Sequence, residues 1–99
     1  MIDIDAVEGF DWDAGNSRKN EEHGVTQTEA EQVFFNEPLL VTRDEKHSSP
    51  ESRYRALGRT DGGRLLTIIF TLRGSGTLIR VISARDMNHR EHLAYEKNS

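Results

Sequence analysis

Apolar and polar residues alternate along three runs in the second half of the chain, at 54–60, 64–72 and 78–84. Successive side chains of a β-strand point to opposite faces of its sheet, so this alternation is typical of strands with one buried face. Asp61-Gly62-Gly63 and Gly74-Ser75-Gly76 separate the runs, and both are tight-turn sequences. The pattern therefore predicts three consecutive antiparallel strands.

Helical signals lie in the first half of the chain. Asp13 precedes a polar stretch at 14–22 that ends before His23-Gly24, a typical C-terminal signal. Thr26 and Glu29 then have the spacing of a capping box. Apolar residues follow at helical spacing, namely Ala30, Val33 and Phe34. We expect two helices, one capped by Asp13 and one that starts after Thr26.

Shorter runs complete the predicted fold. Phe10 and Trp12 alternate with acidic residues, as in a short strand with one buried face, and residues 1–8 before them form a loosely held end. The remaining elements are a strand at 39–42, a charged loop at 43–52 and a helix at 86–97. The order β-α-α-β-β-β-β-α predicts one α+β domain over residues 1–99, with helices packed on one face of a largely antiparallel sheet.

The charge of the chain is distributed unevenly. Residues 1–51 hold 13 Asp and Glu against 4 Lys and Arg, whereas residues 52–99 hold 4 against 9. The net charge of −4 argues against a general nucleic-acid binder, but the basic half points to an anionic partner. Eight of its nine basic residues are Arg, whose planar guanidinium suits phosphate.

Several classes of protein are excluded or disfavoured. Cysteine is absent, so disulfides and thiolate metal sites are excluded, as is typical of the cytoplasm. The longest apolar run, 65–72, is far too short to span a membrane, and the acidic N-terminus lacks a signal-peptide pattern. No nucleotide-binding fingerprint is present. We expect a cytoplasmic protein without a cofactor or a membrane contact.

Arginines occur within the predicted apolar strands, and the position of each in the alternation predicts the face of the sheet to which it points. Arg53, Arg55 and Arg59 share parity, so we expect them on one face of the sheet. Arg80 and Arg85 are five residues apart, so simple alternation places them on opposite faces of their strand. A sheet face with several guanidinium groups can bind phosphate, which indicates RNA as the partner.

A guanidinium within an apolar strand needs an anionic partner, because burying it unpaired is costly. For Arg80 that partner is either a phosphate or a carboxylate of the chain, with Glu51 and Glu91 as the candidates. For Arg64 and Arg85, at strand ends near the last helix, the pattern favours phosphate.

His47 and Glu51 are the candidates for proton transfer. Metal-free RNA cleavage requires a base for the 2′-hydroxyl, an acid for the leaving 5′-oxygen and cations for the developing charge. His47 and Glu51 lie four residues apart and can converge as base and acid, since His titrates near neutral pH. In the alternative interpretation, both only hydrogen-bond a polar loop.

The last predicted helix carries two further pairs of residues. Glu91 and Tyr95 are four residues apart and share a helix face, where Tyr95 either stacks on an RNA base or packs in the core. His89 and His92 have a spacing that can ligate a metal, but no convincing third ligand accompanies them. We therefore expect no metal site.

The order and spacing of these residues resemble the BrnT family of bacterial toxins, the ribonuclease half of a toxin–antitoxin pair. The segments that carry the resemblance are Phe10-Asp11-Trp12-Asp13, Lys19-Asn20, His23-Gly24-Val25, Glu29-Ala30-Glu31, Val33-Phe34, Pro38-Leu39, His47-Ser48, Glu51, Arg53, Gly58, Gly63-Arg64-Leu65-Leu66, Ile79-Arg80, Ile82-Ser83-Ala84-Arg85, Glu91 and Tyr95. One departure is Asp86-Met87-Asn88, which stands where small and basic residues are expected and makes the start of the last helix less basic.

The resemblance implies a fold similar to RelE-type toxins and other small microbial ribonucleases, and a metal-independent endoribonuclease that arrests translation and growth. We assign catalysis to His47, Glu51, Arg64, Arg80 and Arg85. We assign RNA binding to Arg53, Arg55, Arg59, Glu91 and Tyr95. The chemistry expected is attack of the 2′-hydroxyl on the adjacent phosphate.

A partner is also implied, namely a BrnA-type antitoxin with a ribbon-helix-helix DNA-binding end. Toxin and antitoxin are expected to form a heterotetramer that binds operator DNA only through the antitoxin. Phe10 and Trp12 are then either core anchors or part of a groove for this partner. Two other functions stay open: a catalytically weak or inactive toxin that acts as corepressor with its antitoxin, and a structural or adaptor domain without an RNA role.

Overall fold

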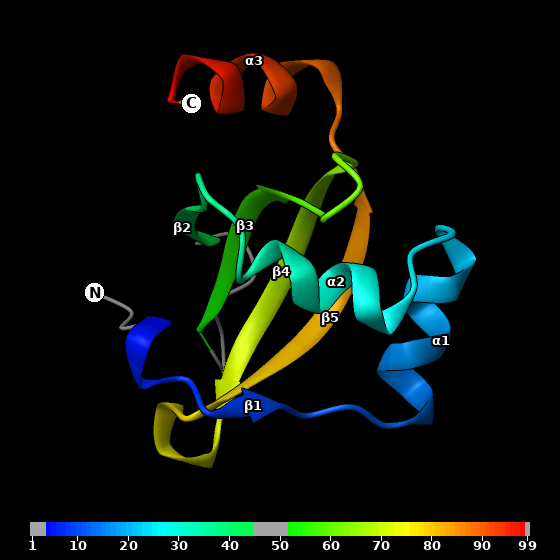
Figure 1. Cartoon of the computed structure of the whole chain (residues 1–99). Helices are drawn as coiled ribbons and strands as arrows, with labels where there is room; N and C mark the ends of the chain where they lie inside the picture. The colour runs from blue at the N-terminus through cyan, green and yellow to red at the C-terminus, as the bar shows by residue number, and fades with distance from the viewer. Residues whose placement is uncertain (1–3, 45–51, 99) are drawn as a thin grey trace.

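In the computed structural model, which describes residues 4–44 and 52–98, five strands form one sheet in the order β1-β5-β4-β3-β2 (Figure 1). The strands are β1 Gly9–Phe10, β2 Leu40–Asp44, β3 Arg53–Arg59, β4 Leu65–Arg73 and β5 Leu78–Asp86. β1 runs parallel to β5, and all other neighbours are antiparallel. The predicted α+β class with a largely antiparallel sheet is therefore confirmed.

Three α-helices accompany the sheet within the described residues: α1 Ala14–Glu22, α2 Gln27–Val33 and α3 His89–Lys97. Short 3₁₀ helices span Ile4–Ala6 and Gly74–Gly76. Figure 1 shows α2 across one face of the sheet, α1 beside β5, and α3 across one end of the strands. Residues 4–8 join the sheet through the backbone N–H of Glu8, which donates to the carbonyl of Thr77 at 2.7 Å.

The helix starts follow from local side-chain capping. Asp13 Oδ1 accepts from the backbone N–H groups of Gly15 and Asn16, which confirms Asp13 as the cap of α1. Thr26 and Glu29 form the expected capping box of α2. Between the helices, Gly24 has a φ of +70°, a conformation that glycine adopts without a side-chain clash.

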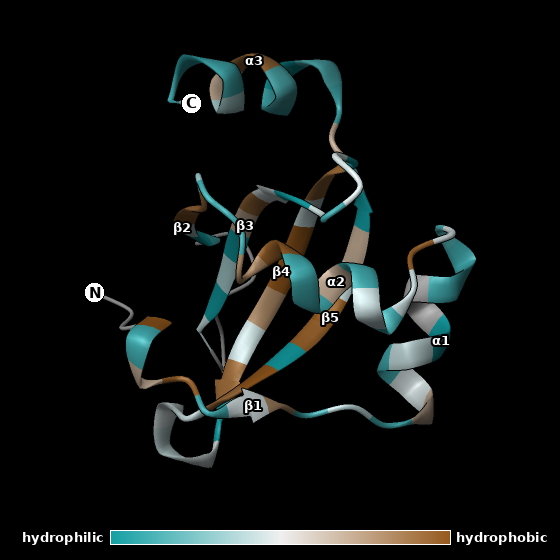
Figure 2. Cartoon of the chain, in the orientation of Figure 1, coloured by the Kyte–Doolittle hydropathy of each residue, from teal (hydrophilic) through white to brown (hydrophobic). Residues whose placement is uncertain are grey.

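α1 is attached by polar rather than apolar contacts, and Figure 2 shows it largely in white to teal. Asn16 is buried, and its side-chain Nδ2 donates to the carbonyls of Val81 and Asp11, both at 3.0 Å. Its Oδ1 accepts from the backbone N–H of Asp13 at 2.7 Å. One amide thereby joins the helix start to the edge of β5, so α1 depends on hydrogen bonding more than on burial of a hydrophobic face.

The core lies between α2 and the sheet face that α2 covers. Figure 2 shows the hydrophobic colour concentrated on β4 and β5. The fully buried side chains include Val25, Ala30, Val33, Leu66, Ile68, Phe70, Ile79, Val81 and Ala84. Phe34 packs edge-on to Phe70 with ring centroids 5.1 Å apart, and Phe70 stacks on Tyr54 at 5.5 Å. This aromatic chain fixes α2 over the centre of the sheet.

A register shift between β4 and β5 corrects the predicted faces of two arginines. Ile69 is opposite Ser83, but the next residue, Phe70, is opposite Val81, so β5 carries one extra residue. Arg85 and Arg80 consequently lie opposite Thr67 and Thr71, which share a face of β4. The prediction from simple alternation, that Arg80 and Arg85 point to opposite faces, is wrong because it assumed an uninterrupted strand.

The prediction that all helices pack on one face is also wrong, for α3. The α3 side chain Glu91 accepts a hydrogen bond from Thr67 Oγ1 at 2.8 Å. Thr67 alternates with the core residues Leu66 and Ile68, so it belongs to the face opposite α2. The sequence identified the helix but not the face, because the two polar positions that hold it are 24 residues apart.

Gly58 tests how closely α2 approaches the sheet. A Cβ at Gly58 would lie 2.7 Å from Val33 Cγ1 and 3.3 Å from the Val33 carbonyl oxygen. Gly58→Ala is expected to lower the free energy of unfolding by about 1–3 kcal/mol through overpacking. Gly62→Ala is the control, because its nearest neighbour would be Thr60 Oγ1 at 3.9 Å. Urea denaturation that finds the two variants equally stable would contradict the packing described.

Candidate functional site

The sheet face opposite α2 carries a series of arginines, and we call it the arginine face. Its members on β3, β4 and β5 are Arg53, Arg55, Arg59, Arg73, Arg80 and Arg85. The cross-strand partners Thr42, Ile69, Thr67 and Thr71 fix this assignment. The predicted common face of Arg53, Arg55 and Arg59 fits the register, and the extra residue of β5 adds Arg80 and Arg85.

A hollow of about 350 Å³ lies beside this face. Its lining consists of Gly15, Asn16, Arg53, Thr71, Arg73, Arg80, Val81 and Ile82. It thus combines three arginines, a threonine and the first turn of α1. Hydrogen-bond donors of this kind at a concave surface are suited to an anionic group such as a phosphate.

Arg80 is held in the hollow by two carboxylates of the N-terminal segment. Its Nη2 donates to Asp13 Oδ2 at 2.8 Å, and its Nη1 lies 3.6 Å from Asp11 Oδ2. The backbone N–H of Asn16, and after it the Arg80 guanidinium, lowers the pKa of Asp13 below its ordinary 3.8. The expected partners of Arg80, Glu51 or Glu91, are therefore replaced by Asp11 and Asp13, since α1 starts beside β5.

Arg53 and Arg55 differ from Arg80 because neither forms an ion pair within the part of the chain that the structure describes. Arg53 lines the hollow. The Nε of Arg55 is buried and has no hydrogen-bond partner. An unsatisfied buried donor is costly, so an acceptor that reached this nitrogen would lower that cost.

Arg85 forms a two-pronged ion pair with Glu91 at the start of α3. The distances are 2.7 Å from Nη1 to Oε1 and 2.9 Å from Nη2 to Oε2. Glu91 also accepts from Thr67 Oγ1 and, at 2.9 Å, from the backbone N–H of Asn88. Burial, the largest single influence, raises the pKa of Glu91, but these donors outweigh it and lower the pKa from 4.5 to about 2.

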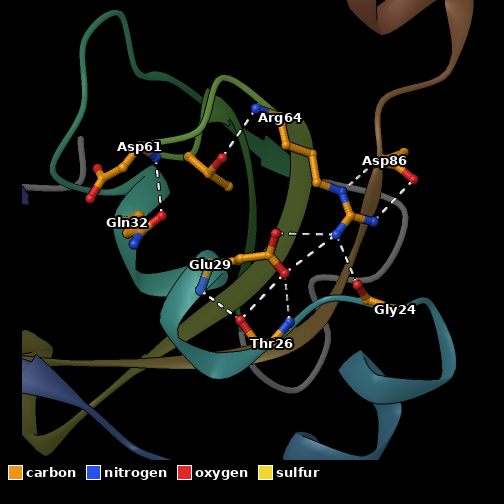
Figure 3. Close-up of polar contacts among 8 residues, drawn as sticks. Gly24, Thr26, Glu29, Gln32, Asp61, Arg64 and Asp86 are labelled. Carbon is orange, nitrogen blue, oxygen red and sulfur yellow. Dashed lines mark hydrogen bonds and ion pairs between the residues drawn. The ribbon is translucent and has the colours of Figure 1, made fainter.

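Arg64 lies on the other face, against α2, where Figure 3 shows its guanidinium between Glu29, Asp86 and Gly24. Its Nε donates to Asp86 Oδ1 at 2.8 Å, and its Nη1 donates to the Gly24 carbonyl at 2.8 Å and to Glu29 at 3.3 Å. The hydrogen bond to Asp86, above all, raises the pKa of Arg64. The side chain therefore joins the residue just before β4 to the end of β5 and the start of α2.

The remaining candidate residues have varied surroundings. Tyr95 is buried, and its hydroxyl donates to the Pro38 carbonyl at 2.7 Å, so its ring is not presented to solvent. His92 Nε2 lies 3.1 Å from Glu96 Oε1. Arg59 is exposed beside a second hollow at the β3–β4 turn. His47 and Glu51 lie outside the described residues, so their proposed roles stay predictions.

Metal and membrane features were searched across residues 4–44 and 52–98. No group of three or more His, Cys, Asp and Glu side chains there could hold a metal ion. No helix of that part is both long and apolar enough to cross a membrane.

Sequence reasoning missed the contribution of the N-terminal segment to the hollow. Asn16, Asp11 and Asp13 lie far from β5 in the chain, yet they meet Val81 and Arg80. One local signal was present, since Asp13 and Asn16 have the spacing of a reciprocal cap. It identifies the start of the helix but not the strand beside it.

Glu91 provides a test of acid stability. Its pKa is about 2 in the folded chain against an ordinary 4.5, so its stabilisation is complete above about pH 4.5 and is lost as the pH falls towards 2. The difference corresponds to an upper limit of about 3 kcal/mol. Urea unfolding of the wild type and Glu91→Gln is expected to show a stability gap at pH 7 that closes by about pH 2. A gap that is constant with pH would contradict this assignment.

A comparison with protein-family models identifies the family of the chain. The model described as a ribonuclease toxin, BrnT, of a type II toxin–antitoxin system covers residues 12–91. A comparison with curated proteins found no match. The matched range includes α1, the hollow-lining strands β3, β4 and β5, and the buried Glu91.

Proposed function

The chain belongs to the BrnT family of ribonuclease toxins of type II toxin–antitoxin systems, and on this premise we propose that it is an endoribonuclease that binds RNA along the arginine face. The observation that carries the proposal is Arg53, which forms no ion pair with described residues and lines the same hollow as Arg80, with Arg55 two residues further along the same face of β3. A guanidinium group at a concave surface, without a carboxylate partner among the described residues, favours a polyanion.

The proposed reaction places the scissile phosphate in the hollow. Arg53 and Arg80 donate to its non-bridging oxygens, where negative charge grows as the 2′-hydroxyl attacks phosphorus. Asp11 and Asp13 hold Arg80 before the substrate arrives, so little reorganisation accompanies the reaction. The 5′-oxygen leaves, and a 2′,3′-cyclic phosphate remains.

Proton transfer is assigned to His47 and Glu51, as the sequence predicts. Ser52 follows this segment directly, and its carbonyl accepts from Thr71 Oγ1 at 2.7 Å. Thr71 lines the hollow, so the chain leaves the 45–51 segment at the proposed phosphate site. The reaction requires no metal ion in this scheme, because the arginines supply the positive charge.

The other candidate residues are assigned to different roles according to whether they form an ion pair within the chain. Arg85 and Arg64 already have carboxylate partners, so we assign them to holding the site rather than to first contact with RNA. Glu91 and Tyr95 support the same region by fixing α3. Arg55 and Arg59 extend RNA binding along β3.

The partner of the toxin is an antitoxin, as the family description states for type II systems. We propose a BrnA-like protein with a ribbon-helix-helix dimer, which gives a heterotetramer with two toxins. The antitoxin alone contacts operator DNA, because the acidic half of the toxin disfavours DNA. The toxin acts on RNA in the cytoplasm.

A catalytically weak corepressor is the second candidate function. The observation that favours it is that three of the five residues assigned to catalysis, Arg64, Arg80 and Arg85, are neutralised by carboxylates of the chain itself. The two functions are separated by the rate of RNA cleavage. An active endoribonuclease should cleave RNA faster than its Arg53 variant does, whereas a weak corepressor should not.

Arg53 provides the first test of RNA cleavage. Arg53→Ala is expected to lower the cleavage rate by about 100-fold, since it removes one donor to the developing charge. Arg90→Ala is the matched control, because it removes one exposed arginine from α3 and should change the rate by less than about twofold. Circular dichroism establishes that both variants fold. Full activity of a folded Arg53→Ala would remove the hollow from the proposed mechanism.

Chelation provides the second test. Cleavage of a labelled RNA is expected to continue at an unchanged rate in excess EDTA, because arginines stabilise the phosphate charge. Gel analysis of the products should also show 2′,3′-cyclic phosphate ends. Activity that disappears in EDTA and returns with a divalent cation would overturn the metal-free scheme and direct attention to His89 and His92.

A further inference from the structure

An apolar cavity of about 110 Å³ opens at the β1 edge of the sheet. Its apolar lining consists of Ile4, Val7, Phe10, Phe34, Phe35 and Ile79, and we call this group the aromatic patch. Phe35 is 77% exposed, the most exposed large hydrophobic residue in the described part of the chain. A cavity of this size beside an exposed ring can accept one apolar side chain of a partner.

The aromatic patch is tied to the core, so its shape is preformed. The ring centroids of Phe35 and Phe10 are 6.1 Å apart, and those of Phe10 and Phe34 are 5.7 Å apart. Phe34 in turn packs against the buried Phe70. A rigid anchor site lowers the entropic cost of binding, because few side chains must be ordered by the partner.

Charge around the aromatic patch indicates what kind of partner fits. Glu8 lines the cavity, and Glu37 follows Phe35 by two residues. Both are exposed, and neither forms an ion pair with the residues that the structure describes. A complementary segment would therefore place one large apolar side chain in the cavity and Lys or Arg next to it.

The aromatic patch and the arginine face lie on opposite sides of the sheet. Phe10 is opposite Ile79 in the β1–β5 pair, and Ile79 is buried in the core beneath α2. Arg80, the next residue, points into the hollow on the other side. A partner anchored at the aromatic patch thus leaves the hollow accessible unless a second part of that partner extends to it.

We propose that the aromatic patch is the anchor site for the antitoxin, which inserts an apolar side chain beside Phe35 and pairs a basic residue with Glu8. The antitoxin as occupant rests on the proposed function. The site supplies affinity, whereas inhibition requires a separate segment that covers the arginine face. Binding of the antitoxin and cleavage of RNA are therefore separable by mutation.

The test is a titration of the purified toxin with the antitoxin encoded beside its gene, followed by calorimetry. Phe35→Ser is expected to weaken binding by about 30-fold, or about 2 kcal/mol. Leu93→Ser is the matched control, because Leu93 is 51% exposed on α3 and should leave the affinity unchanged. Phe35→Tyr keeps the ring and should bind within about threefold of the wild type.

The contribution of the charge on Glu8, beside the aromatic patch, is tested separately at low salt. Glu8→Lys is expected to weaken binding and to reduce the dependence of affinity on salt, since a favourable charge pair is lost. Glu21→Lys, an exposed change on α1 with the same effect on net charge, should have little influence.

Three outcomes would overturn the proposal. The first is wild-type affinity in Phe35→Ser, and the second is equal weakening in Leu93→Ser. The third is a toxin dimer in sedimentation experiments that Phe35→Ser dissociates without a change in antitoxin affinity, which would make the aromatic patch a contact between copies of the chain. RNA cleavage by each lone variant should equal that of the wild type. Absence of cleavage in every protein would refute the ribonuclease proposal and leave the affinity result valid.

Discussion

The register shift between β4 and β5 decides which charged groups of this protein can act together. Without the extra residue of β5, Arg80 and Arg85 would point to opposite faces, and one of them would meet the core beneath α2. A guanidinium there would lose its hydration among Ile68, Phe70 and Val81, which is costly without a carboxylate partner. The shift therefore keeps the core apolar and adds both cations to the face that already carries Arg53 and Arg55.

The arginines divide into two groups by what surrounds them. Arg64 and Arg85 are partly exposed but joined to carboxylates, Arg64 to Glu29 of α2 and Asp86 of β5 and Arg85 to Glu91 of α3, so they contribute to the position of α2 and α3 more than to net surface charge. Replacing either one would leave a carboxylate without its partner, which for the buried Glu91 is a large penalty. Arg53 and Arg55 are different, since no described carboxylate neutralises them. A loss of activity is consequently easier to interpret at Arg53 than at Arg64, where loss of structure gives the same result.

Local chemistry explains why parts of this fold were predictable from the sequence. The caps at Asp13 and Thr26 and the turn at Gly63 depend on residues no more than a few positions apart, and all three were identified from spacing. The partners of Arg80, the face of α3 and the extra residue in β5 depend on contacts between distant segments. Nothing in the sequence of β5 distinguishes Ile82 as an extra residue, because it is apolar like Val81 before it and Ile79. The extra residue is seen only in the pairing of β5 with β4.

Contacts between distant segments also limited the prediction of the site. The presence of several arginines on one sheet face followed from parity, but the hollow needs the start of α1, which Asn16 attaches to β5 through two backbone carbonyls. Local spacing identifies the N-terminal cap of α1 but does not show which strand the helix lies beside. Its position matters, because it brings Asp11 and Asp13 to Arg80, whereas Arg53, which also lines the hollow, forms no ion pair with the residues at 4–44 and 52–98. Arg80 is thus held by two carboxylates, whereas Arg53 forms no ion pair with the described residues, an asymmetry that suits the proposed binding of a phosphate at Arg53 and its orientation at Arg80.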